Sequence, residues 1–179
     1  MMETAVSRRE LCAGLGACLE YPGDGSREAA QAAAGRIPSV SAQAAAHAKD
    51  FCAWIGAMDL WTWQEYYVRT FDVMPQCAPY LSVHLFGEEN FRRAELMAGL
   101  KGVYERHEAY GLAELPDHLS VVLKKNGLFG EEEWEELVSL GILPALVKML
   151  GVLEKSGNPY ALVLKAVQTL LTEEVPAHA

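Results

Sequence analysis

Asp117 and His118 are the neighbouring residues whose types best suit chemistry, because a carboxylate and an imidazole can both transfer protons. The thiol of Cys77 is a third candidate reactive group. Adjacent residues do not face each other along a helix, however, so Asp117 is poorly placed to orient His118 as a base. An enzyme that uses these three residues is therefore the weaker hypothesis.

The sequence lacks the common motifs for metal ions, phosphates and hydrolysis. It has no Glu-x-x-His pair of the kind that binds iron in helical bundles. His107-Glu108 begins the zinc-protease pattern His-Glu-x-x-His, but the fifth position is Gly111. The cysteines form no Cys-x-x-Cys pair, and no phosphate-binding glycine loop or nucleophile elbow occurs. We therefore predict a noncatalytic protein that binds no stoichiometric metal or cofactor.

The elements that would position these residues are helices, because apolar residues recur at helical spacing, as in Leu96, Leu100 and Val103. Gly111 and Gly127 are predicted C-terminal caps, Gly157-Asn158-Pro159 is a predicted break, and 72–79 is a predicted crossing loop. The predicted fold is all-α, a single-domain helical bundle spanning residues 1–179. We predict helices at 7–20, 26–35, 41–58, 60–71, 79–86, 88–110, 116–126, 131–140, 142–155 and 158–173.

Charge and composition narrow the classes of partner. The formal charge is −9 and the pI is about 5.0, which disfavours nonspecific binding to nucleic acid and favours a basic peptide. No uncharged apolar run approaches the roughly 20 residues that span a bilayer, and the best stretch, 137–147, contains Gly141 and Pro144. We therefore expect no integral membrane segment. We also expect a monomer, with a domain-swapped dimer as a minor form.

Ser7-Arg8-Arg9-Glu10-Leu11 allows two interpretations. It superficially matches a twin-arginine export motif, but Glu20 and Asp24 interrupt the stretch that should be apolar in a signal peptide. Ser7 and Glu10 instead have the spacing of a capping box, in which each side chain accepts a hydrogen bond from the other residue's backbone N–H. The capping box is the interpretation that we favour.

Several fragments occur in an order that resembles the NarJ/TorD/DmsD family of molybdoenzyme assembly chaperones, and the NarJ (nitrate reductase delta-subunit) branch most closely. They are Leu19-Glu20-Tyr21-Pro22, Tyr66 to Asp72, Tyr80 to Gly87, Arg93 to Met97, Leu115-Pro116-Asp117-His118-Leu119 and Ser156 to Ala161. The sequence departs from the family pattern at Ala94, where Gly is common, and at Ser120 and Lys124-Lys125. These departures leave the fold expectation intact but bear on which partner is bound.

The resemblance implies a TorD-like fold and a cytoplasmic chaperone without catalytic activity. The implied partner is an immature molybdopterin oxidoreductase catalytic subunit, bound through its N-terminal peptide until its molybdopterin cofactor is inserted. The alternatives are a helical adaptor without such a client and the enzyme considered above. The client-peptide-binding residues implied by the resemblance are Tyr67, Phe71, Asp72, Tyr80, Arg93, Leu115, Pro116, Asp117 and His118.

The residue types by themselves favour more ordinary roles for several of these positions. Asp117 suits a cap at a helix start that Pro116 initiates, and His118 suits the surface or one structural hydrogen bond. The resemblance implies instead that both face a ligand. Most aromatic residues between 54 and 71 are predicted to pack in the core, including Phe71, whereas Tyr67 could serve both packing and binding. The glutamates of 131–136 are predicted to form a solvated helix start.

Overall fold

The computed structural model describes residues 6–109 and 113–174, and these residues form helices joined by short connections. The only β-type pairing among them is an isolated bridge between Tyr80 and His118. The all-α prediction is therefore confirmed. The elements are α1 (Arg8–Ala17), α2 (Ser26–Arg36), η1 (Ile37–Ser39), α3 (Ala42–Gly56), α4 (Leu60–Phe71), α5 (Leu81–Phe86), α6 (Phe91–Arg106), α7 (Leu119–Lys124), η2 (Asn126–Leu128), α8 (Glu131–Leu137), η3 (Val138–Ile142), α9 (Leu143–Lys155) and α10 (Tyr160–Glu174).

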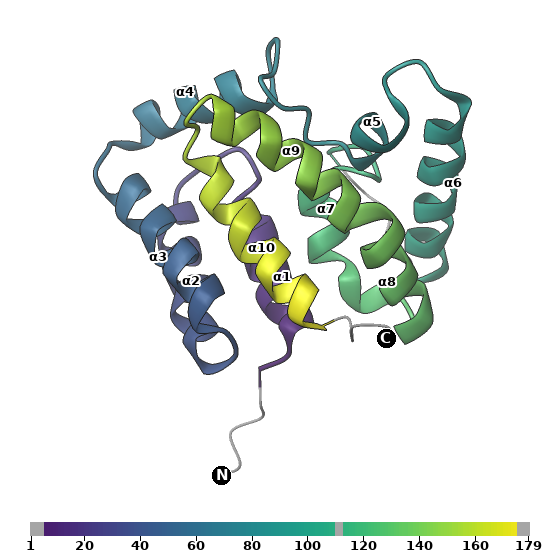
Figure 1. The fold of residues 1–179 in the computed structure, drawn as a ribbon, viewed down its shortest axis with the longest axis horizontal. Coiled ribbons are helices and arrows are strands. Elements are labelled where there is room, and N and C mark those ends of the chain that lie inside the picture. Colours follow the sequence, from purple (N-terminus) through teal and green to yellow (C-terminus); the bar gives the residue numbers. More distant parts are fainter. Residues whose placement is uncertain (1–5, 110–112, 175–179) are drawn as a thin grey trace.

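Helix α10 lies at the centre of the bundle and packs against α1, α3 and α9 (Figure 1). Its apolar residues lie on several faces, and Tyr160, Leu164 and Val167 are fully buried. Such all-round burial is typical of a core helix. Helices α2 and α3 lie at one edge of the molecule and α6 lies at the opposite edge (Figure 1).

Two of the helix ends use the capping groups that the local sequence predicts. Ser7 and Glu10 form the predicted capping box at the start of α1. At the end of α9, Gly157 has φ 64°, and the N–H groups of Gly157 and Asn158 donate to the carbonyls of Glu154 and Leu153 in a Schellman motif. The prediction for Gly127 was wrong, because it lies inside η2 without a left-handed backbone. Gly111 lies outside the described residues.

Helices α8 and α9 are joined by the π-helical turn η3 into one continuous helix, Glu131–Lys155. The sequence predicts a break at residue 141, but the wider π turn keeps the backbone helical through Gly141 and Pro144. Pro144 closely follows this π turn, so the change in hydrogen-bond register lies next to the residue that has no backbone N–H. The predicted solvated start is confirmed, because Glu131, Glu132 and the other glutamates of α8 are exposed.

Glu131–Lys155 is also long and apolar enough to cross a membrane by length and composition, and no second helix of the described chain meets this test. One such helix is weak evidence for membrane insertion, because core helices of soluble proteins share its length and composition. Its α9 part packs against α5 and α10, as expected of a core helix in a soluble protein.

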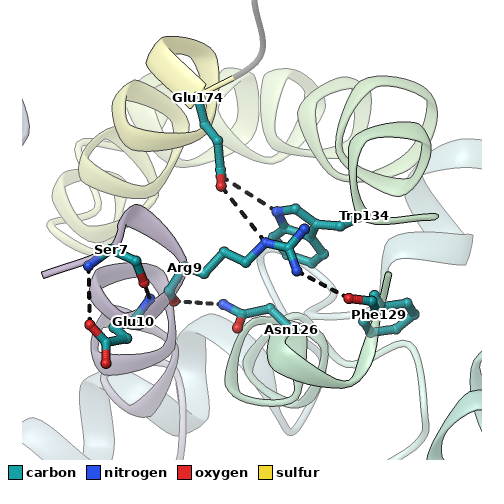
Figure 2. A network of polar contacts seen from close by, with 7 residues as sticks. All are labelled: Ser7, Arg9, Glu10, Asn126, Phe129, Trp134 and Glu174. Carbon is teal, nitrogen blue, oxygen red and sulfur yellow. Dashed lines mark hydrogen bonds and ion pairs between the residues drawn. The ribbon is translucent and has the colours of Figure 1, made fainter. Parts of the chain in front are cut away.

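Arg9, the second arginine of the twin-arginine-like motif, links α1 to α8 and to the end of α10 (Figure 2). The guanidinium of Arg9 lies over the ring of Trp134 at 5.4 Å, donates to the carbonyl of Phe129 at 3.1 Å and pairs with Glu174 at 3.8 Å. Asn126 donates to the carbonyl of Arg9 at 2.6 Å. Arg9 therefore has a tertiary role in this fold, in keeping with the capping-box interpretation.

Candidate functional site

The predicted site is centred on a junction between two connections that are distant in sequence. Tyr80 and His118 form an antiparallel bridge, in which the N–H of Leu81 donates to the carbonyl of Asp117 at 3.0 Å and the N–H of Leu119 donates to that of Pro79 at 2.8 Å. This pairing requires extended backbone at His118. The predicted helix start at Pro116 was therefore wrong, and α7 begins at Leu119.

Asp117 is fully buried and caps a helix other than its own. Its Oδ2 accepts a hydrogen bond from the backbone N–H of Ser82, in the first turn of α5, at 3.0 Å. Asp117 thus acts as a helix cap across 35 residues of sequence, instead of capping the helix that follows it. The other oxygen, Oδ1, has no hydrogen-bond donor among the described residues. A buried acceptor without a donor is uncommon and costs free energy.

His118 caps α7, because its Nδ1 accepts from the N–H of Ser120 at 3.2 Å. The imidazole is 1% exposed and meets the ring of Tyr80 edge-on, with the centroids 5.5 Å apart. Burial lowers the pKa of His118 below its usual value, against the opposing effect of Glu114, Asp117 and Glu20. A neutral ring suits the acceptor role of Nδ1.

Tyr67 and Phe71 project from α4 into the aromatic core. Their rings lie 5.4 Å apart and both contact Tyr160. The hydroxyl of Tyr67 donates to the carbonyl of Leu19 at 3.3 Å, and the exposed ring of Tyr21 stacks edge-on against Tyr67. Phe71 is therefore a packing residue, as expected, whereas Tyr67 connects the core to a surface aromatic ring.

Carboxylates surround these tyrosines. Burial raises the pKa of Tyr67, and Glu114 and Asp72 raise it further by their negative charge. The pKa of Tyr80 is also raised by burial and then by Glu114, whose Oε2 accepts the Tyr80 hydroxyl at 3.4 Å. We call this surface the aromatic–acidic face. It consists of Glu20, Tyr21, Tyr67, Asp72, Tyr80 and Glu114, which interact with one another, and of Leu115, which follows Glu114 in the sequence.

A surface hollow of about 430 Å³ lies beside the aromatic–acidic face and shares Tyr21 with it. Its other walls come from the outer side of α4, where Trp61 is 69% exposed. Trp61 is thus the exposed exception among the aromatic residues of this region, most of which are expected to pack in the core. We call the hollow the α4 groove, lined by Tyr21, Trp61, Gln64, Glu65, Val68 and Arg69. The spacing of 61, 64, 65 and 68 on one helical face was the sequence signal for it.

Leu115 and Arg93, two further predicted site residues, are not buried in the way that Asp117 and His118 are. Leu115 is 44% exposed and adds apolar surface to the aromatic–acidic face. Arg93 lies on α6, where its Nε donates to the hydroxyl of Ser82 at 3.0 Å and its Nη1 donates to the carbonyl of Glu88 at 2.7 Å. Arg93 therefore contacts Ser82, the residue whose N–H donates to Asp117. This contact links α6 to α5.

The structure pairs Cys77 with His84 instead of with Asp117 and His118. The Sγ of Cys77 lies 4.0 Å from the Nε2 of His84, and that nitrogen lies 2.7 Å from the carbonyl oxygen of Ala78. Burial raises the pKa of the Cys77 thiol to about 12, so the nucleophilic thiolate is scarce at neutral pH. Within the described ranges, no three His, Cys, Asp or Glu residues gather closely enough to hold a metal ion.

Comparison with known structures supports the fold. A crystal structure from Archaeoglobus fulgidus, named "putative redox enzyme maturation protein", has a TM-score of 0.64 to this chain at 17% sequence identity. The match covers 96% of this chain and 98% of that one, so the two share the whole helical fold. A sequence search of curated proteins finds no match.

The family model described as nitrate reductase delta subunit matches residues 37–170. This span contains all nine predicted client-binding residues and the helices from α3 to most of α10. The resemblance to the NarJ branch is therefore confirmed. The chain belongs to the nitrate reductase delta subunit family, whose members are noncatalytic maturation chaperones of redox enzymes.

Proposed function

We propose that this chaperone binds the N-terminal peptide of a molybdopterin oxidoreductase catalytic subunit, specifically that of a nitrate reductase, in the cytoplasm. The family argues against the enzyme alternative, because its members are noncatalytic. The family description supports the nitrate reductase client. In this proposal the molybdopterin cofactor belongs to the client, and the chaperone binds the peptide on the aromatic–acidic face and along the α4 groove.

The observation that carries the proposal is the buried carboxylate of Asp117, whose Oδ1 has no donor among the described residues and whose charge, like that of Glu114, acts on Tyr80. A Lys or Arg side chain of the client would supply that donor and the opposite charge. Charge-assisted hydrogen bonds are the stronger ones in proteins, particularly away from water. Because Asp117 is fully buried in the free chain, the peptide must displace part of the covering surface to reach it.

The exposed residues supply the initial contact. Leu115 and Trp61 offer apolar surface, while Asp72 and Glu114 offer negative charge that attracts a basic segment. An amphipathic client helix could place its apolar side chains in the α4 groove and its basic side chains against the carboxylates. The chaperone then delays maturation steps only if it binds the immature subunit more tightly than the folded one.

The decisive experiment is calorimetric titration of the client's N-terminal peptide into wild-type protein and Asp117→Asn. Asn also accepts the Ser82 N–H, so α5 stays capped while the charge is lost. We expect binding to weaken by about 1.5–3 kcal/mol, because a charge-assisted bond in a desolvated site is removed. Asp59→Asn is the matched control, since Asp59 caps α4 through the Thr62 N–H on exposed surface.

Equal affinity of the two Asn variants and wild type, with unchanged melting curves, would remove Asp117 from the peptide site. His118→Asn provides a second test, because Asn can still cap α7. If the peptide does not bind wild-type protein, the helical adaptor without a molybdoenzyme client becomes the better hypothesis.

A further inference from the structure

A second groove, of about 460 Å³, opens on the other side of the molecule from α4, between α6 and the continuous helix α8–η3–α9. Its floor is apolar and includes Leu85 and Phe86 of α5, Leu100 of α6 and Leu137 of α8. None of the nine predicted client-binding residues lines it. We call it the α6 groove.

Among the described elements α6 packs mainly against α5, and part of the rest of its length borders the groove. Among its sixteen residues only Leu100, Val103 and Tyr104 are buried. On the opposite wall, Leu140 is 68% exposed and belongs to the π-helical turn η3. π turns inside α-helices are costly and occur frequently at functional sites.

The charged residues of this groove all have the same sign: Glu95, Glu133 and Glu136. Glu133 forms an ion pair with Arg106 at 3.4 Å and accepts a hydrogen bond from the N–H of Gly130. Among the described residues, no ion pair neutralises Glu95 or Glu136. The groove therefore presents an apolar floor between two carboxylates on opposite walls.

We infer that the α6 groove binds an amphipathic helix with Lys or Arg on its flanks, from a partner protein, as a docking site separate from the aromatic–acidic face. Apolar side chains at helical spacing would occupy the floor, and the flanking cations would meet Glu95 and Glu136. A second copy of this chain is a poorer occupant, because each copy has a formal charge of −9.

Gly99 gives a way to block this groove without disturbing the fold. It lines the groove, it is exposed, and a Cβ added there would meet no atom within 4 Å. Gly99→Arg therefore fills the groove and places a positive charge where the partner's cation would bind. Gly56→Arg is the matched control, because Gly56 is also an exposed helical glycine with open space, at the end of α3.

The probe is a 14-residue peptide of leucine and lysine patterned as an amphipathic helix, with a leucine–glutamate peptide of the same pattern as its control. Hydrogen exchange of the full chain is measured with and without each peptide at physiological salt. We expect the leucine–lysine peptide to slow exchange in 91–106 and 138–142 of wild type and Gly56→Arg. In Gly99→Arg, this protection should disappear and the affinity for that region should fall about tenfold or more.

The proposal is overturned if wild-type α6 gains no protection, if Gly99→Arg retains it, or if the leucine–glutamate peptide protects α6 equally. Asp117→Asn separates this result from the proposed function, because it should leave the protection of α6 unchanged. Conversely, Gly99→Arg should leave calorimetric binding of the client's N-terminal peptide unchanged. Each site can therefore fail its test without affecting the other.

Discussion

Helices α10 and α6 are of similar length, but they contribute to the molecule in opposite ways. Eight of the fifteen residues of α10 are buried and pack on α1, α3 and α9. Only three of the sixteen residues of α6 are buried, and its apolar Leu96 borders an open groove. The α10 side is therefore expected to contribute more to stability than the α6 side, whose apolar surface lines the groove that we propose as a docking site.

Matched truncations test this comparison with the largest expected effect. Trp63 is buried beside α10 and its Nε1 donates to the hydroxyl of Tyr160 at 2.9 Å. Trp63→Ala should lower the free energy of unfolding by about 3–5 kcal/mol, because it opens a large cavity. Leu96→Ala, on the half-buried face of α6, should cost less than about 1 kcal/mol, since little apolar area is lost there. Urea denaturation measures both, and equal losses would contradict the comparison.

Adding one methyl group should change stability in opposite directions on the two sides. A Cβ on Gly16 of α1 would lie 2.9 Å from the Cβ of Leu123 and 3.3 Å from the carbonyl oxygen of Ser120. Gly16→Ala should therefore cost about 1–3 kcal/mol by overpacking the contact between α1 and α7. Gly99→Ala should gain about 0.4–1 kcal/mol, because it fits the helix and restricts the unfolded chain. Thermal melts of the two variants measure these changes. If both variants gain stability or both lose it, the packing argument is wrong.

Two arginine substitutions compare a side chain that makes several tertiary contacts with one that is exposed. Arg9→Ala should destabilise by about 1–2 kcal/mol, because it removes the stacking on Trp134 and the hydrogen bond to Phe129. Arg92→Ala changes an exposed residue at the start of α6 and should shift stability by less than about 0.5 kcal/mol. Chemical denaturation of both variants provides the measurement. A negligible effect of Arg9→Ala would show that the network in Figure 2 contributes little to stability.

Stability should also depend weakly on pH, because His84 of α5 and His118 titrate differently in the folded and unfolded chain. Burial lowers the pKa of His84, opposed by the Ala78 carbonyl and assisted by Lys148, and burial also lowers that of His118. The unfolded chain therefore binds protons at these positions before the folded chain does. Their contribution to stability is present above the unfolded pKa of about 6.5 and declines as the pH falls below it.

Denaturation at pH 7.5 and pH 5.5 measures this decline, and His118→Asn should reduce it because Asn caps α7 without titrating in this range. Hydrogen exchange should show α5 and α7 opening before α10 as the solution is acidified. An identical pH dependence in wild type and His118→Asn would assign the decline to other groups.

Much of the secondary structure could be predicted because its signals are local. The bounds of α4 agree with the expected 60–71, and Ser7 with Glu10 and Gly157 mark helix ends as expected. The errors occur where tertiary contacts override local preference. Bridge formation with the segment 79–81 moved the start of α7 from Pro116 to Leu119, and the π turn η3 joined two helices that Gly141 was expected to separate.

Periodicity, capping residues and motif order are properties of neighbouring residues, so the sequence alone predicts the helical class and the family, and both predictions are confirmed. The tertiary structure was needed to show that Asp117 caps α5, that its Oδ1 has no donor within 6–109 and 113–174, and that α6 borders a groove. These features depend on which surfaces meet across long sequence separations. No local pattern specifies those distances, because packing of the whole core determines them.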